Sequence, residues 1–143
     1  MSTQLSNKFR YLLAQKIVDF ANDTFKIILM STGFTFSPST HAGYADVSGS
    51  ELGDGVGYTT GGATLTGVTI TQDNTNNKCK ITWDNATWSA SGGDMGPVCG
   101  AIIYDDTLTT PEADLIVGFI DFDGSYSEPD GGVATVSNIE VDL

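Results

Sequence analysis

The stretch GYTTGGATLTGVTITQDNTNNKCKITWDNATW, residues 57–88, decides the fold class because it places a turn between two short runs of alternating residues. Residues 73–77 are mostly Asn and Asp, which favour turns over regular structure. After this turn, Cys79, Ile81 and Trp83 alternate with polar residues. A period of two residues is typical of a strand with one buried face, so the stretch predicts a β-hairpin.

Glycines divide the first half of this hairpin. Residues 61–62 are both glycine and are expected to precede the strand. In the run ATLTGVTITQ, Leu65 has one parity, Val68 and Ile70 have the other, and Gly67 lies where the phase changes. Because glycine accepts the backbone of a β-bulge at little cost, the pattern predicts a bulge at Gly67.

The rest of the chain predicts more strands and one helix. The runs FKIILMS, PVCGAIIYDD, ADLIVGFIDFDG and GVATVSNIEVDL have strand length and are separated by turn-forming residues. Near the N-terminus, apolar residues recur at helical spacing, which predicts a helix over about residues 5–20. These residues are Leu5, Phe9, Leu12, Leu13, Ile17 and Phe20. The expected fold is one mainly β domain over residues 1–143, an antiparallel β-sandwich or flattened barrel of about seven strands with one N-terminal helix.

A long segment of low periodicity, residues 32–57, separates the first predicted strand from the hairpin. Loops of this length in compact domains are usually functional or disordered. This one contains Phe34, Phe36, His41 and Tyr44, aromatic groups that a disordered tether would not need. We therefore expect an ordered arm that packs on another surface, such as a neighbouring subunit.

The charge of the chain is strongly negative and unevenly distributed. The formal net charge is −12, yet residues 1–26 hold four basic residues against two acidic ones. No basic residue follows Lys80. Such a field repels phosphate backbones and anionic membranes, so neither nucleic acid nor membrane is expected as a partner. The sequence also has no run of about 18 apolar residues and no secretory signal pattern, so folding in a cytoplasm is expected.

Two cysteines and an acidic stretch raise the question of bound metal. Cys79 and Cys99 are expected to be buried free thiols unless the fold brings their strands together. In DFDGSYSEPDGG, Asp121, Asp123 and Glu128 are candidate ligands for a hard cation such as Ca²⁺, although the spacing departs from the EF-hand pattern. An acidic turn between strands explains the same residues and is preferred. No metal and no cofactor are therefore expected.

No set of residues predicts catalysis. His41 has a side chain suited to acid–base work, but no Gly-x-Ser-x-Gly elbow or paired cysteine supplies a nucleophile for it. Trp83 shares the parity of Ile81 and is expected in the core, whereas Trp88 is the better candidate for a surface platform. The chain is expected not to be an enzyme.

The order of these features resembles small β-rich virion proteins of tailed bacteriophages and prophages. The resemblance extends over nearly the whole chain, through DTFKIILMSTGFTFSP, HAGYADVSGSEL, GYTTGGATLTGVTIT, ITWDNATWSA, GAIIYDD and LIVGFIDFDG. Its most specific part is GYTTGGATL followed by the tryptophan-containing strand and the IIYDD strand. The resemblance implies a structural role in the particle and implies no catalytic residue.

Within such a particle, the resemblance implies a capsid decoration or cement protein that bridges major capsid subunits, often as a trimer. Its partners would be the major capsid protein and further copies of itself, in a virion assembled in the host cytoplasm. A tail, baseplate or fibre component contacting the host surface is the alternative, as is a soluble carbohydrate- or calcium-binding β-module. The residues expected to contact a protein partner are Lys8, Arg10, Lys16, Phe34, Phe36, His41, Tyr44 and Trp88.

Overall fold

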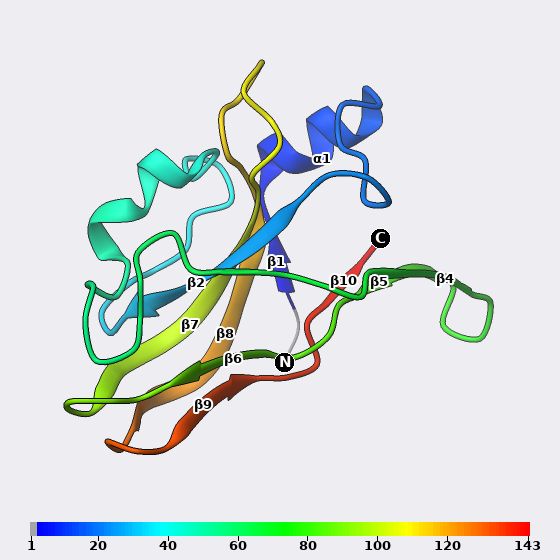
Figure 1. The fold of residues 1–143 in the computed structure, drawn as a ribbon. Helices are drawn as coiled ribbons and strands as arrows, with labels where there is room; N and C mark the ends of the chain where they lie inside the picture. Colours follow the sequence, from blue (N-terminus) through cyan, green and yellow to red (C-terminus); the bar gives the residue numbers. More distant parts are fainter. Residues whose placement is uncertain (1–2) are drawn as a thin grey trace.

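The structure, a computed structural model, describes residues 3–143 and is mainly β with one α-helix (Figure 1). The chain begins with β1 (Thr3–Leu5), α1 (Asn7–Ala14) and β2 (Phe25–Ser31), and short 3₁₀ helices follow at Tyr44–Asp46 and Ser48–Ser50. The remaining strands are β3 (Ala63–Thr64), β4 (Thr69–Asp73), β5 (Lys78–Thr82), β6 (Ala86–Ser89), β7 (Met95–Asp105), β8 (Leu115–Glu128), β9 (Val133–Val136) and β10 (Glu140–Asp142).

The strands form three antiparallel sheets, which confirms the expected sandwich-like β fold. The largest sheet has the order β1-β8-β7-β2-β3, and the other two are β10-β5-β4 and β6-β9. Figure 1 shows the β6-β9 ribbon crossing near the lower ends of β7 and β8, and the β4-β5 hairpin projecting from the body of the molecule. Residues 3–143 contain more strands than the expected seven because two predicted runs, residues 63–72 and 132–143, are each split between two sheets, and β1 overlaps the start of the predicted helix.

Both faces of the large sheet are covered, which explains the continuous apolar run in β2. Ile27 and Leu29 belong to the larger core cluster, which also contains α1 residues and the inner faces of the small sheets. Ile28 and Met30 belong to a second cluster on the opposite face. Successive side chains in a strand point to opposite faces, so a strand buried on both sides has no polar alternation.

The helix is much shorter than expected. Residues 3–5 form β1, where Thr3 pairs with Ile120 of β8, and α1 ends at Ala14. Lys16 has a φ of 63°, its N–H donates to Leu13 O, and the Ile17 N–H donates to Leu12 O. These two bonds, together with the left-handed conformation of Lys16, form a Schellman C-cap, which terminates the helix. Apolar residues beyond the cap, such as Phe20, are buried in the core without being helical.

The expected bulge at Gly67 is instead a crossing between two sheets. The predicted strand is split into β3 and β4, which belong to different sheets. Gly67 has a φ of 69°, and a Cβ there would lie 2.3 Å from Asp84 Oδ2. The neighbouring Asp84 N–H donates to Thr66 O at 2.9 Å. The glycine is required because two segments of the chain approach each other closely here. The apolar alternation changes phase at Gly67 because the chain passes from one sheet to another, not because of a bulge within one strand.

The hairpin after this crossing is confirmed. β4 pairs with β5 in register from Thr69↔Thr82 to Asp73↔Lys78. The turn is stabilised by Asp73, whose Oδ1 accepts hydrogen bonds from the backbone N–H groups of Thr75 and Asn76 at 3.1 Å each. The turn residues expected from composition therefore form an Asx-type turn.

Two other expectations are settled by the strand positions. β8 continues through Glu128, so the predicted turn over residues 121–132 is wrong in its first two-thirds, and only residues 129–132 turn the chain. Cys79 lies in β5 and Cys99 in β7, in different sheets, and both thiols are free. In residues 3–143, no helix has the length and apolarity needed to cross a membrane.

Candidate functional site

The basic residues of the N-terminal segment lie at the surface. Arg10 and Lys16 are exposed, and Lys8 is half-buried with its Nζ 5.6 Å from the centroid of the Tyr11 ring. Tyr11 itself is exposed, while Phe9 on the other side of α1 is fully buried. The outer side of the helix therefore offers cations and an aromatic ring to solvent or to a partner.

The aromatic residues of segment 32–57 pack on the sheet of their own chain. Phe34 and Phe36 contact Phe119 with ring centroids 5.4 and 5.8 Å apart. His41 stacks on Phe34, and its Nδ1 accepts a hydrogen bond from the Ser37 N–H at 3.0 Å. The segment is ordered, as expected, but these side chains cover the second face of the large sheet rather than extending away from the body.

Glu51, which no sequence pattern singled out, organises the end of the same segment. Its buried carboxylate accepts hydrogen bonds from the Tyr44 hydroxyl, from the Tyr58 hydroxyl at 2.5 Å and from the Gly61 N–H at 2.9 Å. The Tyr58 oxygen in turn accepts from the Leu29 N–H of β2 at 3.1 Å. A residue that looks like an ordinary polar loop side chain thus ties the segment to the sheet.

The phenols in this cluster are held in their neutral form. Burial and then the Glu51 hydrogen bond raise the pKa of Tyr44 to about 12. The same causes raise the pKa of Tyr58, and burial followed by nearby acidic charge raises that of Tyr104. The Tyr104 hydroxyl donates to Gly61 O at 2.8 Å. The cluster is therefore a structural anchor whose donors persist across the physiological pH range.

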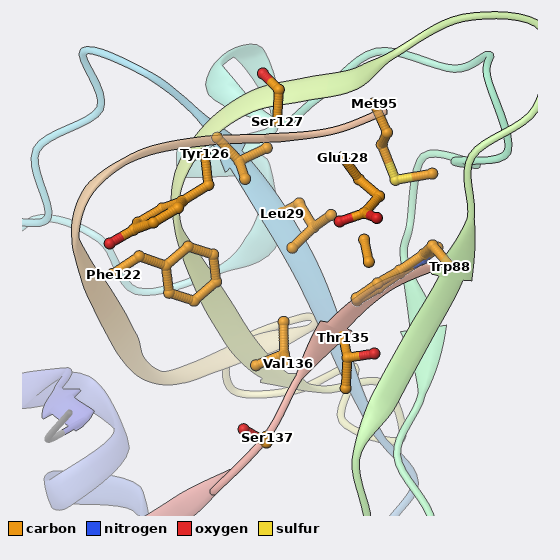
Figure 2. A pocket seen from close by; sticks show the side chains of 12 residues that line it. Leu29, Trp88, Met95, Phe122, Tyr126, Ser127, Glu128, Thr135, Val136 and Ser137 are labelled. Carbon is orange, nitrogen blue, oxygen red and sulfur yellow. The ribbon is translucent and has the colours of Figure 1, made fainter. Parts of the chain in front are cut away.

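A cavity of about 360 Å³ opens between the large sheet and the β6-β9 ribbon (Figure 2). Trp88 of β6 forms one wall and is only 7% exposed, the same fraction as Trp83. The expectation that Trp88 is the freer of the two is therefore wrong, because Trp88 belongs to the larger core cluster and its ring lies 5.9 Å from that of Tyr58. The lining residues are Leu29, Trp88, Met95, Val98, Phe122, Tyr126, Ser127, Glu128, Ala134, Thr135, Val136 and Ser137.

Glu128 lies in this cavity, apart from the other two candidate metal ligands. Asp121 and Asp123 are exposed, and the Asp123 N–H donates to Asp121 Oδ1 at 2.9 Å. Neither of them lines the cavity. Within the described part of the chain, no three His, Cys, Asp or Glu residues are placed to hold a metal ion.

A second acidic group is buried at the far end of β7. Asp105 is fully buried, and its Oδ1 accepts a hydrogen bond from the Thr107 N–H at 3.0 Å. Among residues 3–143, no donor reaches its Oδ2. Burial, and then the nearby Asp23 carboxyl, raise the pKa of Asp105 to about 8. No sequence pattern singled out Asp105, since burial leaves no mark on the residue type.

Comparisons of the chain with protein-family models, with curated proteins and with solved structures find no match. The function must therefore be argued from the residues and their geometry.

Proposed function

We propose that this chain is a non-enzymatic structural component of a tailed-phage virion, a head decoration protein that bridges major capsid subunits. The virion role rests on the resemblance in the order of sequence features. The structural observation that supports a protein-binding role is an apolar rim on the β10-β5-β4 sheet. The rim consists of Val68 and Ile70, which are 37% and 50% exposed; Leu143, 43% exposed, follows β10 on the other side of β5.

The apolar rim continues a row of core residues to the edge of the sheet. Val141 of β10 pairs with Ile81 of β5, which pairs with Ile70 of β4. Directly paired residues share a face, and the first two are fully buried while Ile70 is half exposed. Within residues 3–143, β4 has one neighbouring strand, and its outer edge is not paired with another strand. An apolar, unpaired strand edge is a surface suited to contact with another protein.

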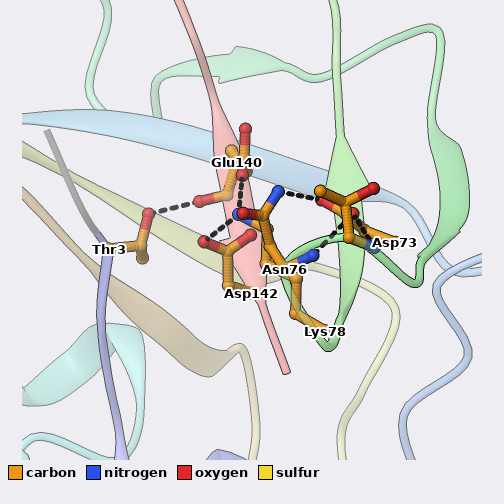
Figure 3. Close-up of polar contacts among 7 residues, drawn as sticks. Thr3, Asp73, Asn76, Lys78, Glu140 and Asp142 are labelled. Atoms are coloured by element: carbon orange, nitrogen blue, oxygen red, sulfur yellow. Dashed lines mark hydrogen bonds and ion pairs between the residues drawn. The ribbon is translucent and has the colours of Figure 1, made fainter.

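The sheet that carries the rim is tied to the body, so the rim is presented on a fixed support. Lys78 Nζ contacts Glu140 Oε1 at 3.1 Å and Asp142 Oδ2 at 2.9 Å (Figure 3). The Thr3 hydroxyl donates to Glu140 O at 2.5 Å, which links β10 to β1. Lys78 is thus paired with acidic residues of its own chain.

The cations near the N-terminus supply the second part of the proposed contact surface. Lys8, Arg10 and Lys16 carry positive charge on a chain that is otherwise acidic. Their natural counterparts are acidic patches on the capsid surface or on another copy of this chain, in a homo-oligomer such as a trimer. Charge complementarity of this kind directs orientation and association rate more than affinity.

The number of copies per purified particle tests the role. A decoration protein occupies repeated capsid positions and is expected in hundreds of copies. A few dozen copies would favour the second candidate, a tail, baseplate or fibre component, for which the aromatic cavity around Trp88 would be a site for a host-surface ligand. Absence from the particle would contradict both.

Binding of the free protein to emptied capsids tests the surface. Ile70→Asp places a charge on the apolar rim and is expected to abolish binding. Thr71→Asp places the same charge on the opposite face of the same strand and is the matched control, expected to bind normally. Equal binding by both variants and the unaltered protein would show that the apolar rim is not the contact surface.

A further inference from the structure

The cavity beside Trp88 is a slot between two strand edges. Its lining includes the consecutive residues 126–128 at the end of β8 and 134–137 in and after β9. Successive side chains of a strand point to opposite faces, so a cavity that touches four residues in a row meets the edge of the strand. The two strands are joined by the turn at residues 129–132 and then diverge, β8 into the large sheet and β9 to β6.

The β9 edge that faces away from β6 offers free backbone groups. The Ala90 N–H donates to Gly132 O at 2.9 Å and the Ala90 C=O accepts from the Gly131 N–H at 2.8 Å, so the ladder is hydrogen-bonded at Ala90, with Gly131 and Gly132 opposite it in a bulge. Hydrogen-bonded and non-bonded pairs alternate along an antiparallel ladder. The pair Thr87↔Thr135 is therefore non-bonded, and the Thr135 N–H and C=O point off the free edge. An added strand would find a donor and an acceptor there.

The slot also contains a carboxylate without a partner. Figure 2 shows the Glu128 carboxylate directed into the cavity, near Trp88 and Leu29. Among residues 3–143 it accepts no side-chain or backbone hydrogen bond and forms no ion pair; the chain's ion pairs are made by Lys26 and Lys78. Because no basic residue follows Lys80, none of the strands that form the walls from β6 onward carries a cation. No cation of this chain lies in the lining of the cavity, so the slot leaves Glu128 open to a positive charge from a partner.

The remaining walls suit the stem of a long cationic side chain. Trp88, Phe122 and Leu29 provide aromatic and aliphatic surface, and Tyr126 stands at the margin (Figure 2). Lysine and arginine bury their methylene stems on apolar surface while the charged head meets a polar group. Aromatic faces add a cation–π attraction. A volume of about 360 Å³ lies at the small end of ligand pockets and accommodates one such side chain.

We infer that this slot binds an extended basic segment of a partner protein. The segment adds as a strand to the free edge of β9 through the Thr135 backbone groups, and one lysine or arginine places its stem against Trp88 and its charge at Glu128. Strand addition supplies backbone hydrogen bonds, and the side-chain pocket supplies specificity. The inference goes beyond the proposed function, because the slot is the same whether the partner is a capsid subunit or another protein.

Two synthetic peptides test the slot directly. The first is acetyl-Val-Thr-Lys-Thr-Val-amide, and the second has norleucine, an uncharged chain of similar length, in place of lysine. Titration into the labelled protein is followed by the NMR shifts of the Trp88 indole N–H and the Thr135 amide. The lysine peptide is expected to shift both and to bind about tenfold more tightly than the norleucine peptide, as one charge-assisted contact allows. A lysine peptide with every amide N-methylated is expected not to bind.

Two variants make the test specific. Glu128→Gln keeps the shape of the side chain and is expected to remove the preference for lysine over norleucine. Asp121→Asn makes the same charge change on the same strand outside the cavity and is expected to leave the preference intact. The inference is overturned if the lysine peptide shifts neither resonance, if both peptides bind equally to the unaltered protein, or if the methylated peptide binds as well. The inference is also overturned if the Trp88 indole resonance shifts with N-acetylglucosamine but not with the peptide, a result that would indicate a sugar site.

Discussion

Asp105 combines full burial with a carboxylate oxygen that no donor reaches. A buried carboxyl group in this situation favours its protonated form, since ionisation would place a charge in an apolar environment beside the Asp23 carboxyl. The pKa of Asp105 is raised from 3.8 to about 8. The folded chain therefore holds a proton that the unfolded chain loses as the pH rises from about 4 to about 8, so this group lowers stability progressively through that range.

Asp105→Asn is expected to stabilise the protein at about pH 8 and to have little effect at about pH 4. The amide keeps the size of the protonated acid and cannot ionise. The gain at the higher pH is expected to be at least about 1.4 kcal/mol, the equivalent of a single pKa unit. Urea unfolding of the variant and the unaltered protein at both pH values measures it.

Asp106→Asn is the matched control for this prediction. Asp106 neighbours Asp105 but is exposed, with its Oδ2 4.0 Å from Lys26 Nζ. An exposed ion pair at this distance contributes little, so the control variant is expected to show no gain at the higher pH. An Asp105→Asn effect that is the same at both pH values would contradict the proposed protonation.

At the scale of elements, the end of α1 and the anchoring of segment 32–57 depend on single side chains. Lys16 adopts a left-handed conformation that costs a non-glycine residue about 1 kcal/mol or more. Glu51 accepts hydrogen bonds from Tyr44, which precedes it in the chain, and from Tyr58 and Gly61, which follow it. Neither role is visible from residue type, since lysine is rarely a C-cap and glutamate is usually exposed.

Lys16→Gly is expected to stabilise the protein by about 0.5–1 kcal/mol, because glycine adopts the left-handed conformation without steric cost. Lys8→Gly is the matched control. It removes the same charge from the first turn of α1 and is expected to destabilise the protein by about 0.5–1 kcal/mol. Thermal unfolding of both variants provides the comparison, and destabilisation by Lys16→Gly would contradict the C-cap assignment.

Glu51→Ala is expected to destabilise the protein by about 2–4 kcal/mol, because it leaves the Tyr44 and Tyr58 hydroxyls and the Gly61 N–H without their acceptor. Tyr44→Phe removes only one of these bonds and is expected to cost about 1 kcal/mol. Urea unfolding ranks the two variants. Equal stability of Glu51→Ala and the unaltered protein would show that the cluster does not hold the segment in place.

At the scale of the whole molecule, a net charge of −12 opposes the compact state through self-repulsion. Only Lys26 and Lys78 take part in ion pairs within residues 3–143, so most of the acidic groups of this part of the chain lie outside ion pairs. The acidic exterior and the apolar rim are properties of the assembled fold, because both depend on which residues of the separate sheets reach the surface.

The melting temperature is expected to rise by about 2–4 °C when NaCl is raised from about 10 to about 150 mM, if screening contributes about 1 kcal/mol. CaCl₂ at equal ionic strength is expected to have the same effect, because Glu128 lies in the cavity while Asp121 and Asp123 do not. A fall with NaCl would contradict the repulsion. An additional rise specific to calcium would indicate a cation site after all.

The sequence by itself determined the features that depend on neighbouring residues. Alternation at Ile81 and Trp83 predicted a strand with one buried face, and the residues at 73–77 predicted the turn that pairs β4 with β5. The mainly β class followed from many such short runs. These predictions succeed because side-chain periodicity and turn propensity are set within a few residues of chain.

Only the tertiary structure decided which partner covers each apolar side chain. Apolar residues at helical spacing extend from residue 5 to residue 20, yet the helix covers only the middle of this run. Leu5 lies in β1, which pairs with β8, and Phe20 lies beyond the cap at Lys16, but both are buried in the core without being helical. In the same way, Trp88 is buried in the core beside Tyr58, and Glu128 is placed in a cavity formed by strands distant in the chain. A local pattern records that a side chain is buried, whereas the surface that buries it is determined by contacts across the whole fold.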